Sequence, residues 1–150
     1  SIILRKIFTF DDPGYVDLMS PAGIGIAAVI YNYDGDVYAS DESRMLAEMG
    51  DKKFKIGNVI DNSYEEIFFS EELLSPLEES FAYSAPMCND CAFENYCGSD
   101  PVYHHAMHGD FVGRKPESEF CKRNMNIFKY IFNQMQSDPF IEKLFMSWIK

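Results

Sequence analysis

Residues 88–98 read Cys-Asn-Asp-Cys-Ala-Phe-Glu-Asn-Tyr-Cys-Gly, and they contain three of the four cysteines of this chain. The fourth is Cys121, so the complete pattern is C-x2-C-x5-C-x23-C. Thiolates are soft ligands, and four of them complete either an iron–sulfur cluster or a structural zinc site. We therefore predict that Cys88, Cys91, Cys97 and Cys121 bind one metal centre. Their spacing alone does not distinguish iron from zinc.

Disulfides and redox-active thiols are the alternative uses of these cysteines. Disulfide-rich scaffolds are short and secreted, whereas this chain has four cysteines in 150 residues and is 47% hydrophobic. No signal peptide is recognisable at its start, and a disulfide across a C-x2-C spacing is strained in a structural role. These features favour a metal centre and a cytoplasmic protein.

The composition indicates a folded domain with an acidic surface. The 150 residues include 13 Phe, 9 Tyr and 8 Met, enough bulky apolar side chains for one domain with its own core. No run approaches the roughly 18 apolar residues of a membrane span. We therefore expect no membrane insertion. The net charge of −11 repels phosphate backbones, so we expect no nucleic-acid binding either.

Two strands and a tight turn are predicted near the start of the chain. Residues 22–33 carry β-branched and aromatic side chains, Asp34-Gly35 is a strong hairpin signal, and residues 37–39 return as the second strand. Residues 2–10, in contrast, show neither a clean helix period nor a clean strand period.

Helices are predicted over residues 42–49, 64–69, 71–81 and 118–135 and from Pro139 onward. Their candidate caps are, in order, Ser40 or Asp41, Asn62 or Ser63, Ser70, Ser118, and Ser137 or Asp138. The inner stripe expected for the fourth of these helices consists of Cys121, Met125, Phe128, Phe132 and Met135. Cys121 falls in the opening turn, where the helix dipole favours a thiolate. Residues 83–116 show little periodicity, and a loop of that length needs something, such as a bound metal, to order it.

These elements predict an α+β fold: an N-terminal β-hairpin, short helices, a cysteine-rich metal-binding loop and two C-terminal helices. Residues 11–14 (Asp-Asp-Pro-Gly) predict a turn. We expect residues 1–21 to be the tail of a preceding domain or a linker, residues 22–137 to form the cysteine-containing domain, and residues 138–150 to form a final helix.

Three segments together resemble a SPASM domain, the C-terminal extension of radical SAM enzymes that modify peptides and proteins. They are Tyr-Asp-Gly-Asp-Val-Tyr-Ala-Ser-Asp-Glu at 33–42, Ile-Gly-Asn-Val at 56–59, which is expected to be a turn, and the C-x2-C-x5-C-G motif at 88–98. The resemblance covers roughly residues 22–135. From Tyr31 to Asn58 the sequence is most similar to the maturases of the His-Xaa-Ser peptide system.

The departures from the family pattern concern one of its two auxiliary clusters. A full SPASM domain has further cysteines where this chain has Ser40 and Pro101, and no cysteine precedes Gly35. The ligand set of the first cluster is therefore empty. The ligand set of the second matches Cys88, Cys91, Cys97 and Cys121 one for one, so the resemblance implies a single [4Fe–4S] cluster, with a structural zinc module as the alternative.

The resemblance also implies a role and partners. The C-x3-C-x2-C motif that binds the S-adenosylmethionine cluster is absent, so this chain is not expected to be catalytic alone. S-adenosylmethionine would bind only in a radical SAM barrel domain, and this domain would relay electrons and position a peptide or protein substrate. In some relatives an Asp at the place of Asp41 is a candidate proton acceptor; here Asp41 or Ser40 is also expected to be a helix N-cap.

Overall fold

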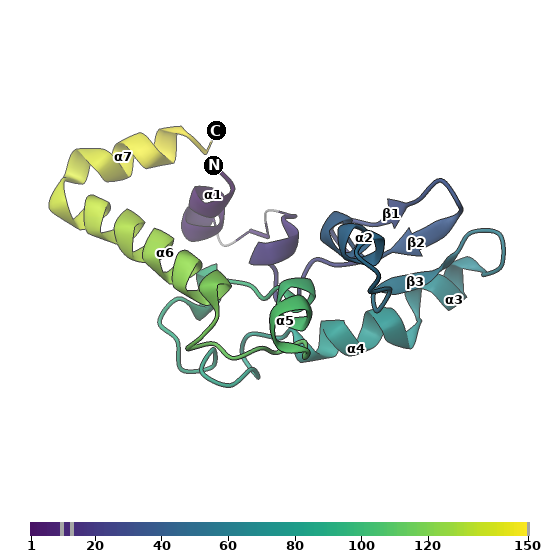
Figure 1. Cartoon of the computed structure of the whole chain (residues 1–150). Helices are drawn as coiled ribbons and strands as arrows, with labels where there is room; N and C mark the ends of the chain where they lie inside the picture. Colours follow the sequence, from purple (N-terminus) through teal and green to yellow (C-terminus); the bar gives the residue numbers. More distant parts are fainter. Residues whose placement is uncertain (10, 13, 150) are drawn as a thin grey trace.

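The computed structural model describes residues 1–9, 11–12 and 14–149, and it confirms the α+β fold (Figure 1). The α-helices are α1 (Ile2–Thr9), α2 (Asp41–Glu48), α3 (Tyr64–Phe68), α4 (Glu71–Glu79), α5 (Pro101–His108), α6 (Glu119–Ser137) and α7 (Pro139–Ser147). The strands are β1 (Ile30–Tyr31), β2 (Asp36–Tyr38) and β3 (Lys55–Asn58), and the 3₁₀ helices are η1 (Val16–Leu18) and η2 (Glu94–Tyr96). The turn predicted at residues 11–14 includes Pro13, which lies outside the described residues.

The predicted hairpin is present, but its first strand is much shorter than expected. β1 and β2 pair antiparallel, with Ile30 opposite Tyr38 and Tyr31 opposite Val37. Residues 22–29 instead form a tight loop that is closed by a bridge between Ile24 and Ala28. Gly25, at a φ of +67°, lets this loop turn directly over Leu73 of α4, where a Cβ would come within 2.5 Å of that side chain.

Residues 55–58 form a third strand, which corrects the prediction of a turn at residues 56–59. β3 pairs antiparallel with β2, and the strand order is β1-β2-β3. The register shifts between Val37 and Tyr38, as in a β-bulge. Four residues that include a glycine carry little strand signal by themselves, so it is the pairing with β2 that makes this segment a strand.

The sheet is covered by helices that share one apolar core with it. The buried members of this core are Ala22, Ile24, Val37, Ala39, Phe54, Ile56, Ile67, Leu73, Val102 and Phe111. They come from β2, β3, α3, α4, α5 and the loops between these elements. In Figure 1 the sheet and α3 lie to the right, and α5 lies between them and α6.

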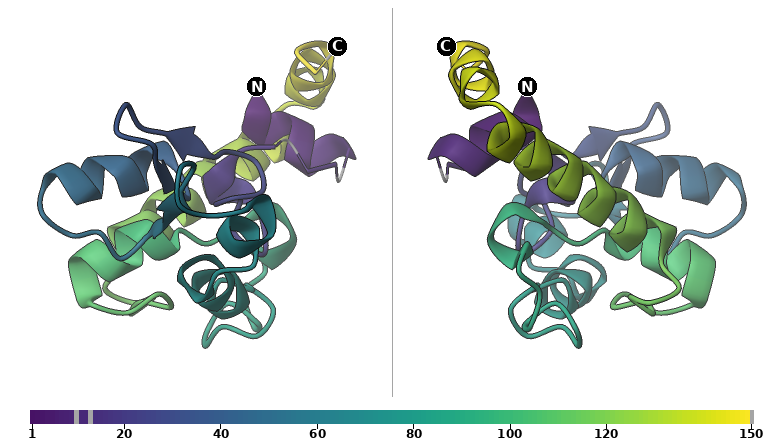
Figure 2. Two further views of the ribbon diagram at one scale, coloured as in Figure 1. Left: turned by 90° about the vertical axis from the view of Figure 1, so that its right-hand side faces the viewer. Right: turned by 90° about the vertical axis from the view of Figure 1, so that its left-hand side faces the viewer.

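A second core holds the two ends of the chain against α6. Its buried residues are Leu4, Ile7, Leu18, Phe128 and Ile131, and Phe145 of α7 packs against it. Residues 2–9 are therefore an amphipathic helix, although the sequence showed no clean period there. Figure 2 shows α1 (purple) and α7 (yellow) beside the C-terminal half of α6.

The segment 83–116 is not an unstructured loop, because it contains η2 and α5. The α5 helix begins with Asp100 as N-cap, whose Oδ1 accepts a hydrogen bond from the N–H of Tyr103, and with Pro101 at its first position. It ends at Gly109, which adopts a left-handed φ of 77°. Pro101 thus starts a helix, which corrects the prediction of a loop over residues 83–116.

Capping side chains fix the starts of α2, α3 and α6 as the sequence predicted, whereas Ser70 stands at the start of α4 without a side-chain capping hydrogen bond. Ser40 and Ser63 each form a capping box at the starts of α2 and α3. Ser118 accepts a hydrogen bond from the N–H of Cys121 at the start of α6. In the described part of the chain, no helix combines the length and the apolar character needed to cross a bilayer.

Candidate metal centre

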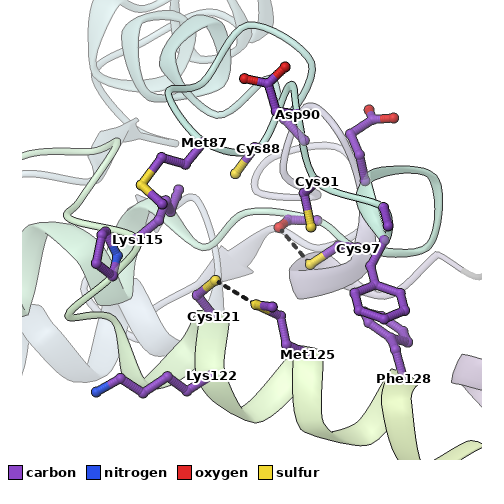
Figure 3. Close-up of a pocket in the computed structure, with 16 residues that line it drawn as sticks. Met87, Cys88, Asp90, Cys91, Cys97, Lys115, Cys121, Lys122, Met125 and Phe128 are labelled. Atoms are coloured by element: carbon purple, nitrogen blue, oxygen red, sulfur yellow. Dashed lines mark hydrogen bonds between the residues drawn. The ribbon is translucent and has the colours of Figure 1, made fainter.

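All four cysteines line one cavity of about 410 Å³ between the cysteine loop and the start of α6. Cys88 and Cys91 come from the loop after α4, Cys97 directly follows η2, and Cys121 lies in the first turn of α6. Figure 3 shows the four side chains around a common space. All four, each within the described residues, are free thiols. The structure thus brings together the four cysteines that the sequence singled out.

Local backbone hydrogen bonds place the three loop cysteines. The N–H of Cys91 donates to the carbonyl of Cys88 at 3.0 Å, so the C-x2-C pair forms a single turn. Met87, just before it, has a φ of 67°, an uncommon left-handed conformation for a residue with a side chain. The N–H of Cys97 donates to the carbonyls of Phe93 and Glu94, which ties the third cysteine to η2.

Cys121 is held by the cap of α6 and by a buried histidine behind it. Ser118, fully buried, accepts from the N–H of Cys121 with 3.3 Å between N and Oγ. The ring Nε2 of His104 lies 3.1 Å from the same Oγ. His104 is also fully buried, and burial lowers its pKa to about 4, so the ring is neutral at neutral pH. The fourth thiol is therefore presented by a rigid helix end.

Gly98 explains why a glycine directly follows the third cysteine. A Cβ at this position would lie 2.5 Å from the carbonyl oxygen of Asp17 and 2.7 Å from the backbone nitrogen of Met19. These are backbone atoms of the η1 segment, so a side chain at position 98 cannot be accommodated by a rotamer change. The contact anchors the cysteine loop to the N-terminal part of the chain.

The thiols stand in surroundings that oppose charge on them. Burial, more than any other cause, raises the pKa of Cys88, Cys97 and Cys121, and neighbouring thiolates add to the rise. Four negative charges in one half-buried cavity repel one another. A bound cation or metal–sulfide core would instead lower the thiol pKa values, because metal ligation requires the deprotonated sulfur.

Two polar side chains close to the thiols partly oppose the rise in their pKa values, and neither was predicted from the sequence. The Nδ2 of Asn124 donates to Sγ of Cys97 at 3.6 Å, and the charge of Lys115 favours the thiolates of Cys88 and Cys121. Asn124 lies one helical turn after Cys121, so its proximity to that cysteine was implicit in the helix prediction. Nothing in the sequence pointed to Lys115.

Four thiols are the right type and number of ligands for a metal centre. Their positions, however, do not form a ready-made site for a single metal ion. Among the described residues, no group of three or more His, Cys, Asp or Glu side chains is arranged to hold a metal ion. None of the three histidines lines the cavity. His105 pairs instead with Asp51 at 2.8 Å, and His104 with Ser118.

Asp41 lies outside the cysteine cavity. It occupies the first position of α2, its side chain is 60% exposed, and its carboxylate lies 3.2 Å from the guanidinium of Arg44. The N-cap is Ser40, whose Oγ accepts from the N–H of Ser43. The structure therefore assigns the cap to Ser40 rather than to Asp41.

Comparison with known proteins found no match: no family model, no curated protein and no solved structure. The residues and the geometry of the cavity are therefore the basis for any functional assignment.

Proposed function

We propose that this chain binds one [4Fe–4S] cluster through Cys88, Cys91, Cys97 and Cys121. The observation that carries the proposal is the 410 Å³ cavity that all four thiols line. A zinc ion would draw the sulfurs to about 2.3 Å from one point, and so to about 3.8 Å from each other. A cluster holds each thiolate on a different iron, which suits a wider arrangement around a larger space.

We propose further that the chain is an auxiliary-cluster domain of a radical SAM enzyme that modifies a peptide or protein. The support is the sequence resemblance at residues 33–42, 56–59 and 88–98. When bound, such a cluster supplies one-electron chemistry. Four cysteine ligands leave no iron open to substrate, so the residues of this chain would hold the cluster beside an active site built by the barrel domain, which binds S-adenosylmethionine. The reducing cytoplasm keeps such thiols free.

Anaerobic reconstitution with iron and sulfide tests the proposal. We expect the wild-type chain to develop a broad visible absorbance that dithionite bleaches. Each of the variants Cys88→Ser, Cys91→Ser, Cys97→Ser and Cys121→Ser should lose most of it, whereas Ser84→Ala, an exposed change in the same loop, should retain it. A colourless protein with one tightly bound zinc would instead favour a structural zinc module, and absorbance that survives all four substitutions would contradict both assignments.

A further inference from the structure

Lys115 is a buried cation in the wall of the cysteine cavity. Only 8% of its surface is exposed, which is unusual for a lysine. Its Nζ donates to the carbonyl of Val112 at 2.6 Å. Among the described residues its ammonium forms no ion pair with a carboxylate. Figure 3 shows Lys115 on the same side of the cavity as Met87 and Cys121.

Asp90 and Glu94 also line the cavity, but among the described residues neither forms an ion pair with Lys115. The charge of Lys115 acts on the thiols. It favours the thiolate forms of both Cys88 and Cys121, which come from different segments of the chain. A second lysine, Lys122, also lines the cavity, but its side chain is 50% exposed and it pairs with Glu119 at 2.7 Å. Solvent and Glu119 screen the charge of Lys122, whereas the charge of Lys115 acts across a cavity with mostly apolar walls.

We propose that Lys115 is a counter-cation built into this cavity, and that it raises the reduction potential of the cluster bound there. The inference rests on the proposed function. Reduction adds one electron from an external one-electron donor to a cluster that four cysteinates already make negative, and no bond or proton is exchanged. A buried positive charge stabilises the more negative state, because cluster potentials respond to nearby charge and to solvent exposure.

Redox titration of the reconstituted protein with dithionite, followed in the visible spectrum, tests the role of Lys115. The variants are Lys115→Met, which removes the charge, and Lys115→Gln, which also keeps a donor for the carbonyl of Val112. Both should lower the ratio of reduced to oxidised cluster at a fixed potential by roughly tenfold, which is about 59 mV for a one-electron couple. The matched control, Lys122→Met, should leave the ratio within a factor of about two.

The outcomes separate this inference from the proposed function. If the wild-type chain forms no cluster, both the proposed function and this inference are wrong. A wild-type cluster whose potential is unchanged in both Lys115 variants overturns the inference alone. If both variants keep the fold of the metal-free protein but bind no cluster, the charge is needed to hold the cluster and the counter-cation role stands. If both variants fail to fold, Lys115 is a packing residue and the inference is wrong.

Discussion

The side-chain amide of Asn124 donates a hydrogen bond to the sulfur of Cys97, with 3.6 Å between Nδ2 and Sγ. This bond links the second turn of α6 to the cysteine loop, and Asn124 is only 5% exposed. It also opposes the rise in the pKa of Cys97 that burial causes. One buried amide therefore both fastens the loop and favours the thiolate.

Replacing Asn124 with Leu should destabilise the metal-free protein by about 1 kcal/mol, because a buried hydrogen bond is lost without a large change in volume. Urea unfolding measures this effect. The matched change Asn126→Leu is on an exposed position of the same helix and should stay within about 0.5 kcal/mol of wild type. Equal losses in the two variants would show that the bond to Cys97 contributes nothing.

The close approach of Gly98 to η1 predicts a large cost for any side chain at that position. We expect Gly98→Ala to lose more than about 2 kcal/mol of unfolding free energy, because the methyl group would collide with backbone atoms. Gly109→Ala has open space around its Cβ and should cost only about 1 kcal/mol for its left-handed φ. Thermal unfolding of the two variants side by side decides the point, and a milder effect at position 98 would contradict the packing described.

Asp100 predicts a specific pH dependence. Burial, followed by the charges of Asp17 and Glu42, raises its pKa to about 6 from 3.8. The folded state therefore binds this proton more tightly than the unfolded state. Stability falls as the pH rises from about 4 to about 6, and the deficit remains above that range.

Asp100→Asn keeps the capping oxygen but cannot ionise, so it should be up to about 3 kcal/mol more stable than wild type at pH 8. The gain should shrink as the pH is lowered through 6 towards 4. The control is Asp138→Asn, since Asp138 is the exposed N-cap of α7. Denaturant unfolding across this pH range provides the measurement, and a gain that does not change with pH would disprove the assignment.

The two candidate caps of α2 should differ sharply in their contributions to stability. Ser40→Ala removes a buried capping box and is expected to cost about 1–2 kcal/mol. Asp41→Asn only weakens an exposed ion pair with Arg44 and should change stability by less than about 0.5 kcal/mol. Calorimetric unfolding of both variants compares them directly. The reverse order would mean that Asp41 is the effective cap.

Local signals predicted those parts of the fold that short segments determine by themselves. Asp34-Gly35 marked the hairpin, and the serines at positions 63, 70 and 118 marked helix starts that the structure has. The α5 helix was missed although its signals were present, since Asp100, Pro101 and Gly109 occupy the cap, first and terminal positions. The error came from reading proline as a loop residue when it also suits the first turn of a helix.

Tertiary contacts determine the two elements, α1 and β3, that local sequence signals did not predict. α1 is a helix because Leu4 and Ile7 pack on Phe128 and Ile131 of α6, and β3 is a strand because β2 pairs with it. The buried residues of α6 are Phe120, Asn124, Phe128 and Ile131, and only Phe128 belongs to the predicted stripe. Phe132 and Met135 of that stripe pack against the second core while partly buried, whereas Cys121 and Met125 line the cavity.

The grouping of the four cysteines was predictable from spacing alone, because thiols that all fall within one short stretch of the chain favour a shared metal centre. The polar side chains around them were not predictable in the same way. Lys115 reaches the cavity through the turn after α5, and its distance along the chain from Cys88 gives no hint of their proximity in space.

Iron, acid-labile sulfide and zinc analysis of the anaerobically purified chain is the most direct test of the central claim. We expect about four iron and four sulfide per chain, with a loss of both when Cys97 is replaced by Ser. One zinc per chain with no sulfide, or four thiols that remain reactive with no metal bound under these conditions, would contradict it.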